Sequence, residues 1–160
     1  MDLGLNGKIA IITGGSDGIG KAAATSMASE GANVAIVGRT QSKLDAAVAD
    51  IKTVANGSVL GVAADVSIES DVQAMVNKVV EKFGGVDILV NNAGTSSTQT
   101  LENMTDNDLK VDFGIKIYGA IYCARAVLPF LKASGSGAIV NTTTPGGKAS
   151  GPGKQPTTLS

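Results

Sequence analysis

Short apolar runs alternate with longer segments of helical periodicity along this chain. Five runs rich in branched aliphatic residues predict strands at 8–13, 33–37, 59–63, 86–90 and 138–141. Each run is nearly continuous in apolar character, which is typical of strands that are buried on both faces of a parallel sheet.

Four segments between these runs have apolar residues at helical spacing, and they predict helices at 18–30, 41–54, 68–83 and 105–132. Thr40 is the expected N-cap of the second helix, and Thr105 with Asp108 three residues later forms a capping-box pattern at the start of the fourth. Pro129 is expected to bend or loosen the last turn of that helix. The alternation of strands and helices predicts an α/β fold with a doubly wound parallel sheet and right-handed crossovers.

Composition narrows the class of protein. A chain of 160 residues with 43% hydrophobic residues fits a single domain, 1–160, that can bury a core. The balance of 13 basic and 14 acidic residues indicates neither a nucleic-acid partner nor a membrane partner. The single Cys123 excludes an intramolecular disulfide, the chain has no histidine, and the first residues do not resemble a signal peptide. We therefore expect a cytoplasmic protein without a metal site.

A glycine-rich turn, TGGSDGIG at 13–20, lies between the first predicted strand and the first predicted helix. Gly14 would let the chain turn tightly, Gly18 would let the backbone approach a pyrophosphate, and Gly20 would let the helix pack close to the strand. The N–H groups at the start of the helix favour phosphate. The alternative is a tight turn that binds no ligand.

The end of the second strand indicates which dinucleotide is preferred. A carboxylate here would bind the adenosine ribose hydroxyls and favour NAD, but this chain has Gly38 followed by Arg39. A guanidinium can grip a 2′-phosphate with two hydrogen bonds, so NADP(H) is favoured over NAD(H). Arg39 could instead be a solvated surface residue. Asp17 adds negative charge within the phosphate turn and argues against NADP.

Four motifs together resemble the short-chain dehydrogenase/reductase family: TGGSDGIG at 13–20, Asp65-Val66, NNAG at 91–94 and GAIVN at 137–141. The resemblance runs from about residue 5 to the C-terminus. It implies a single Rossmann-type NAD(P)-binding domain with five strands in the order 3-2-1-4-5, flanked by helices and without the later strands of the family. The fifth strand would then be an open edge.

The resemblance also implies where the cofactor binds. Gly14, Ser16, Gly18, Ile19 and Gly20, with Asp17 in the same turn, would hold the pyrophosphate and ribose. Arg39 and Thr40 would meet the 2′-phosphate, and Asp65 and Val66 would border the adenine. Asn92, Ala93 and Gly94 would line the adenosine ribose and the central sheet, although Asn91 and Asn92 could also serve strand-end backbone groups.

The catalytic positions of the family are substituted here. Family members use Asn, Ser, Tyr and Lys, and the matching positions hold Lys116, Thr144 and Thr157, with the lysine falling at 161, past the last residue. Thr144 could still orient a carbonyl, but the aliphatic hydroxyl of Thr157 cannot replace a tyrosine as proton donor. Lys116 brings a titratable amine, although a helix-surface or water-network role is the alternative. Tyr118, Tyr122 and Cys123 are expected to be packing or interface residues.

Three functions remain open on this basis. The first is an NADP-dependent oxidoreductase that transfers hydride between NADP(H) and a carbonyl or alcohol substrate, homo-oligomeric in a full-length form. The second is a non-catalytic NADP(H)-binding sensor or scaffold. The third is an interaction module without nucleotide binding, which the intact glycine turn argues against. Residues 146–160, rich in Gly, Pro, Ser and Thr, are expected to form a flexible active-site loop or tail.

Overall fold

A five-stranded parallel sheet organises the computed structural model, which describes residues 3–95, 98–143 and 155–156. The strands are β1 (Ile9–Thr13), β2 (Asn33–Gly38), β3 (Val59–Ala63), β4 (Ile88–Asn91) and β6 (Ala138–Asn141). Their order, β3-β2-β1-β4-β6, confirms the predicted 3-2-1-4-5 arrangement. The fourth strand begins two residues later than its apolar run suggests.

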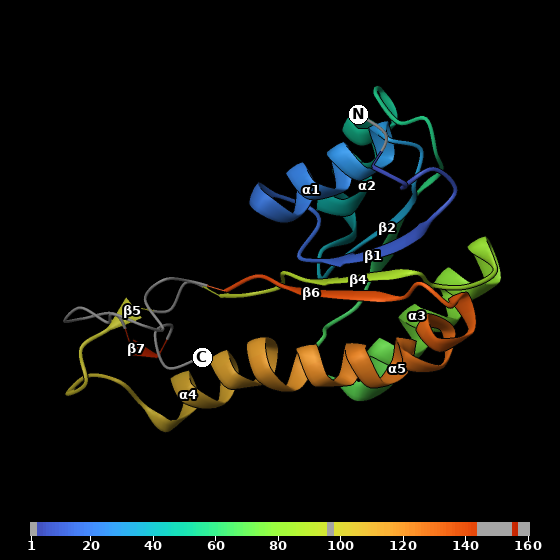
Figure 1. The fold of residues 1–160 in the computed structure, drawn as a ribbon. Helices are drawn as coiled ribbons and strands as arrows, with labels where there is room; N and C mark the ends of the chain where they lie inside the picture. The colour runs from blue at the N-terminus through green and yellow to red at the C-terminus, as the bar shows by residue number, and fades with distance from the viewer. Residues whose placement is uncertain (1–2, 96–97, 144–154, 157–160) are drawn as a thin grey trace.

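Helices cover both faces of this sheet (Figure 1). α1 (Gly18–Ser29) and α2 (Gln41–Lys52) lie on one face, and α3 (Glu69–Phe83) and α5 (Gly119–Ser134) lie on the other. Side chains of β1 alternate between two buried clusters, with Ala10 and Ile12 on the α1–α2 side and Ile11 on the α3–α5 side. Because both sides of each central strand are buried, its sequence is apolar without alternation.

The helix starts agree with the predicted caps in part. Thr105 and Asp108 form the expected capping box at the start of α4 (Asp106–Phe113): Thr105 N donates to Asp108 Oδ2 at 2.9 Å, and Asp108 N donates to Thr105 Oγ1 at 3.2 Å. Thr40 occupies the N-cap position of α2 but makes no side-chain capping bond. The predicted N-cap position of α2 is therefore confirmed, but the Thr40 side chain does not cap the helix.

The predicted fourth helix is not one regular helix. A π-helical turn, η1 (Gly114–Tyr118), separates α4 from α5, and Pro129 lies inside α5, which continues to Ser134. By length and composition alone, the 29-residue segment Asp106–Ser134 could span a membrane. One face of α5, including Cys123, Val127 and Leu131, is buried in the core under the sheet, as expected of a helix in a layered α/β fold.

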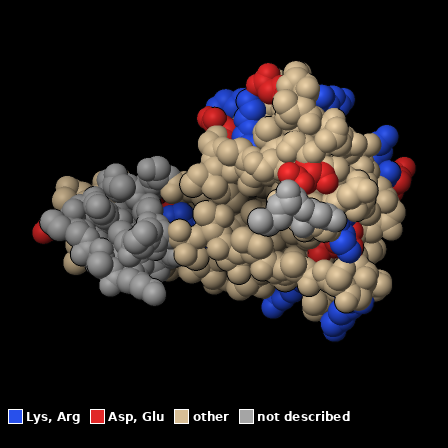
Figure 2. Space-filling model, turned by 45° about the horizontal axis from the view of Figure 1, so that its top comes forward, with Lys and Arg blue, Asp and Glu red and all other residues tan. Residues whose placement is uncertain are grey.

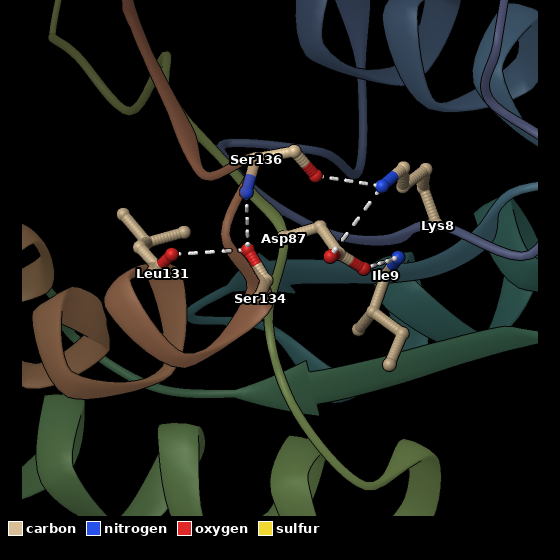
Figure 3. A network of polar contacts seen from close by, with 6 residues as sticks. All are labelled: Lys8, Ile9, Asp87, Leu131, Ser134 and Ser136. Carbon is tan, nitrogen blue, oxygen red and sulfur yellow. Dashed lines mark hydrogen bonds and ion pairs between the residues drawn. The ribbon is translucent and has the colours of Figure 1, made fainter.

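A polar network ties the amino-terminal ends of β1, β4 and β6 together (Figure 3). Asp87 Oδ2 accepts from the backbone N–H of Ile9 at 2.8 Å, and Lys8 Nζ donates to Ser136 Oγ at 2.8 Å. Ser134 Oγ in turn donates to the carbonyl of Leu131 at 3.0 Å. This network fastens the end of α5 and the start of β6 to the sheet, at the edge opposite the glycine turn.

The strand β6 is an open edge within the described part of the chain, as the sequence predicts. It pairs with β4, all four of its residues are exposed, and the exposed fractions of Ile139 and Val140 are 41% and 51%. A second, two-stranded antiparallel sheet joins β5 (Thr98–Gln99) to β7 (Gln155–Pro156). Gln155 and Pro156 belong to the segment 146–160, for which a flexible loop or tail is predicted, and the other residues of that segment lie outside the described residues.

On the face that Figure 2 shows, charged residues of both signs lie around the margin, and acidic residues with a basic neighbour also lie near its centre. The described residues of this face therefore form no basic stripe of the kind that binds nucleic acid.

Candidate cofactor-binding site

Thr13, at the carboxyl end of β1, joins the ends of two neighbouring strands. Its Oγ1 accepts hydrogen bonds from the backbone N–H groups of Asn92 and Ala93, both at 3.0 Å, and donates to the carbonyl of Val90 at 3.3 Å. The loop after β4 is therefore held against the glycine turn after β1. Motifs that are 79 residues apart in sequence become one surface.

The glycines of the turn are required by close contacts. Gly14 has a φ of 65°, and a Cβ there would lie 3.0 Å from Ala93 Cα and from Asn92 Nδ2. A Cβ on Gly20 would overlap the Gly14 carbonyl oxygen and lie 2.5 Å from Asn92 Nδ2. That amide donates to the carbonyls of Thr13 and Gly14, at 3.1 and 3.3 Å. The side chain of Asn92 thus serves strand-end backbone groups, as one alternative proposed.

Gly18 is different, because a Cβ there would meet no atom within 4 Å although its φ is 54°. The backbone at the start of α1 is therefore open to the approach of another group, which is the role that the glycine spacing predicts. Asp17 is the N-cap of α1, and its carboxylate accepts from Gly18 N–H at 2.8 Å. Its negative charge is stabilised at the positive end of the helix.

A cavity of about 210 Å³ lies between the carboxyl ends of β1, β2, β3 and β4. Predicted residues that line it are Gly14, Ser16, Arg39, Thr40, Asp65, Val66, Ala93 and Gly94. Lys43, in the first turn of α2, also lines it and was missed by the sequence analysis. The available signal was a basic residue in the first helical turn after Arg39, because this turn faces the same strand ends.

Asp65 is held by the turn that follows β3. Its Oδ1 accepts from Ser67 N–H at 2.9 Å and from Ser67 Oγ at 2.6 Å, and its own backbone N–H donates to Asp71 Oδ2 at 3.2 Å. The next residue, Val66, is buried, and a Cβ on Gly119 would lie only 2.9 Å from its Cγ2. The start of α5 therefore approaches the exit of β3 closely, and Gly119 permits this.

A second cavity of about 530 Å³ adjoins the first at the tips of β1, β4 and β6. The two cavities share Val66, Ala93, Gly94 and Ile115. Predicted residues Ile19, Asn92 and Lys116 also line the second cavity, together with Asn91, Asn141, Thr142 and Thr143. Asp17, Gly18 and Gly20 line neither cavity.

Lys116 is not the surface residue that one alternative suggested. Its side chain is 17% exposed, and its Nζ lies 3.0 Å from Oδ1 of Asp112, whose side chain is fully buried. Thr95 Oγ1 donates to the same Oδ1 at 2.7 Å. Asp112 and Thr95 were not predicted from the sequence, and the available signal for Asp112 was its i,i+4 spacing from Lys116.

The other predicted catalytic positions, Thr144 and Thr157, lie outside the described residues. Within the described part of the chain, Tyr118 and Tyr122 stack on each other with ring centroids 6.3 Å apart, and Tyr118 is exposed. Cys123 is buried, and desolvation raises the pKa of its thiol to about 12. Neither the tyrosine pair nor the thiol lines the two cavities, so neither is placed for chemistry in them.

The described residues fit a dinucleotide. The two adjoining cavities form one path across the carboxyl ends of the strands, and Gly18 opens the helix start beside it. Arg39 and Lys43 supply two cations at one end of this path. No group of three or more His, Cys, Asp or Glu residues that could hold a metal ion occurs among the described residues.

Known proteins resemble this chain along nearly its whole length. An uncharacterized oxidoreductase of Bacillus subtilis is 38% identical over 147 residues, which cover 92% of this chain and 55% of the relative. L-Sorbose reductase from Gluconobacter frateurii, solved with NADPH and L-sorbose, is 40% identical with a TM-score of 0.87, over 91% of this chain and 55% of that one.

An NAD⁺-bound xylitol dehydrogenase is 28% identical with a TM-score of 0.91, over 97% of this chain and 60% of its own. The chain thus spans between about half and three fifths of the length of these three proteins. Of the two solved structures, one contains NAD⁺ and the other NADPH, so they show no preference between the two cofactors. Residues 8–156 match the family described as short chain dehydrogenase, and the chain belongs to this family of oxidoreductases.

Proposed function

We propose that this chain forms the NADP(H)-binding part of an oxidoreductase that acts on the carbonyl or alcohol group of a small molecule. The observation that carries the proposal is the pair of cations, Arg39 and Lys43, in the wall of the first cavity, with Gly38 where a carboxylate would favour NAD. A guanidinium and an ammonium together suit the 2′-phosphate that distinguishes NADP from NAD.

Each part of the path has a separate role in this proposal. The open backbone at Gly18 and the start of α1 receive the pyrophosphate. Val66, which is buried after β3, borders the adenine, and Ala93 and Gly94 support the middle of the ligand between the two cavities. The bound cofactor supplies hydride transfer. The chain binds it and orients it toward the second cavity.

A second candidate is an NADP(H)-binding protein without turnover. It is favoured by the residues of the second cavity, where the described part of the chain places amides, threonines and Lys116 but no tyrosine. Turnover of carbonyl compounds with NADPH, measured by loss of absorbance at the nicotinamide band, separates the two candidates. Robust turnover by the 160-residue chain would exclude the second. A cytoplasmic location and a homo-oligomeric full-length form remain predictions under both.

Titration of the protein with NADPH and with NADH, followed by nicotinamide fluorescence, tests the cofactor assignment. We expect NADPH to bind at least about tenfold more tightly, because hydrogen bonds to charged groups contribute about 1.5–3 kcal/mol each. Arg39→Ala should remove most of this difference and Lys43→Ala part of it. Lys52→Ala, at the exposed end of α2, is the matched control and should change neither affinity. Equal affinities for NADPH and NADH in the unmutated protein would contradict the assignment.

A further inference from the structure

The side chains of Thr95, Asp112 and Lys116 form a polar unit beside the second cavity, and no catalytic position of the family resemblance accounts for Asp112 or Thr95. Asp112 lies on α4 with its side chain fully buried; its Oδ1 accepts a hydrogen bond from Thr95 Oγ1 at 2.7 Å and forms an ion pair with Lys116 Nζ at 3.0 Å. Thr95 comes from the loop after β4, so the unit ties that loop to the helix. A buried carboxylate of this kind is stable only when it is paired and hydrogen-bonded.

The π-helical turn η1 determines where Lys116 lies. Wide turns of this type are rare and occur frequently at functional sites. Lys116 Cε lies 3.7 Å from the place that a Cβ on Gly94 would occupy, so its aliphatic stem passes the glycine of the loop after β4. Lys116 and Thr95 both line the second cavity.

The electrostatics of the two cavities differ. Arg39 and Lys43 in the first cavity are two cations suited to a phosphate. Behind the wall of the second cavity, the buried Asp112 balances the charge of Lys116, so the pair has no net charge and favours a neutral polar ligand over a second anion. An ammonium has three N–H donors, and Asp112 approaches it with one carboxylate oxygen, so donors remain for a ligand.

Asn91 lines the same cavity and carries a buried amide oxygen. Its Nδ2 donates to Asn141 Oδ1 at 3.0 Å, whereas its buried Oδ1 has no hydrogen-bond partner in the described part of the chain. A ligand hydroxyl can accept a hydrogen bond from Lys116 and donate one to an amide oxygen. Neutral hydroxyls therefore match this end of the path better than phosphate or carboxylate.

We propose that Asp112, held by Thr95, is a positioning residue that fixes the Lys116 ammonium to hydrogen-bond the ribose hydroxyls in the nicotinamide half of the bound dinucleotide. This inference rests on the proposed function, because it requires the phosphate-bearing half to occupy the first cavity. It assigns to Lys116 the role of a hydrogen-bond donor to the ribose and not that of a catalytic base.

Comparison of two ligands tests the two cavities separately. NADPH reaches both cavities, whereas adenosine 2′,5′-bisphosphate has no nicotinamide half and occupies only the first. Dissociation constants of both are measured by calorimetry for the unmutated chain, Lys116→Met, Asp112→Asn and the double variant Asp112→Asn/Lys116→Met. Lys110→Met, an exposed lysine on the preceding helix, is the matched control.

We expect Lys116→Met and the double variant to weaken NADPH binding about tenfold or more while leaving the bisphosphate within about twofold. Asp112→Asn should weaken NADPH binding by a smaller factor, again without affecting the bisphosphate, because Lys116 remains but is no longer held. Lys110→Met should change neither. The double variant leaves no unpaired buried charge, so it keeps the test decisive if Lys116→Met alone fails to fold.

Unchanged NADPH affinity in the double variant would overturn the inference. Equal weakening of both ligands would also overturn it, since that result would assign the unit to the fold and not to the nicotinamide half. In both of these cases the proposed function still stands, provided that the unmutated chain binds the bisphosphate. Failure of the unmutated chain to bind either ligand would overturn both proposals.

Discussion

At the residue scale, close packing within the glycine turn requires glycine whether or not a ligand binds there. Gly20 lies where a Cβ would overlap the Gly14 carbonyl oxygen and crowd Asn92 Nδ2. The same amide joins the ends of β1 and β4 through two hydrogen bonds. One methyl group at Gly20 would therefore disturb both the turn and the strand ends that form the cofactor path.

We predict that Gly20→Ala lowers the free energy of unfolding by about 1–3 kcal/mol, the usual cost of overpacking. It should also weaken NADPH binding, because Gly14 and Asn92 move. Urea unfolding followed by circular dichroism measures the first effect and fluorescence titration the second. Gly85→Ala is the control, since a Cβ there meets no atom within 4 Å and Gly85 has no positive φ. Equal stabilities of the two variants would contradict the packing argument.

Cys123 allows a second test at this scale, because it is the only cysteine in the chain. Burial raises the pKa of its thiol to about 12, so the reactive thiolate is scarce at pH 8 in the folded protein. We predict that a thiol-specific chromogenic reagent reacts slowly with the folded chain and rapidly after unfolding in urea, where the pKa returns to its ordinary value. Rapid reaction in the folded state would show that α5 is not packed on the core as described.

The sequence could predict those residues of the candidate site that directly follow a strand. Gly14, Arg39 and Asp65 occupy the first cavity because each follows a strand whose end could be recognised. Lys43 and Asp112 could not be assigned in the same way, because they lie on helices. Whether a helical residue faces a cavity depends on the phase of the helix, which one-residue irregularities change.

At the element scale, the strands were predictable because burial on both faces leaves them almost purely apolar. The fourth helix shows the limit of this reasoning. Its apolar residues continue through 105–134 without a break, yet η1 (Gly114–Tyr118) widens one turn. A π turn adds one residue and shifts the phase of the helix, which a nearly unbroken run of apolar residues does not reveal. The close contact of Gly119 with Val66 that accompanies it is visible only in three dimensions.

The capping box of α4 gives a pH-dependent prediction for this element. Hydrogen bonds from the side chain and then the backbone of Thr105 lower the pKa of Asp108 below its ordinary value of 3.8. A carboxyl group whose pKa is lower in the folded state stabilises the fold above its unfolded pKa, and this contribution is lost as pH falls through the folded value. The loss therefore occurs below about pH 4.

We predict that Asp108→Asn reduces the acid-induced fall in the melting temperature between about pH 4 and pH 2 and lowers the melting temperature at pH 7. Asp106→Asn is the matched control, because Asp106 lies in the same first turn but makes no capping bond. Melting curves by circular dichroism across this range measure the difference. Identical pH profiles for Asp108→Asn and the unmutated chain would show that the capping box does not contribute to stability.

At the scale of the whole molecule, the two adjoining cavities in which we propose that the cofactor binds lie at the carboxyl ends of the strands, in a sheet whose edge strand β6 is exposed. The network around Lys8 and Asp87 fastens the amino end of β6, and Asn91 with Asn141 joins its carboxyl end to β4. Between these two fastenings, the outer side of β6 presents exposed aliphatic residues and backbone groups. Exposed edges of this kind pair readily with other strands.

We therefore predict that the 160-residue chain associates with itself as its concentration rises, and that Val140→Lys reduces this association. The exposed fraction of Val140 is 51%, so a lysine can extend into solvent without loss of core packing, and a charge on an edge strand opposes the approach of a second strand. Size-exclusion chromatography with light scattering over a hundredfold range of concentration measures the apparent mass. Val54→Lys, which alters an equally exposed valine (48%) just beyond α2, controls for added charge alone. If Val54→Lys reduces the apparent mass as much as Val140→Lys does, the effect is one of net charge, and the β6 edge is not the surface that associates.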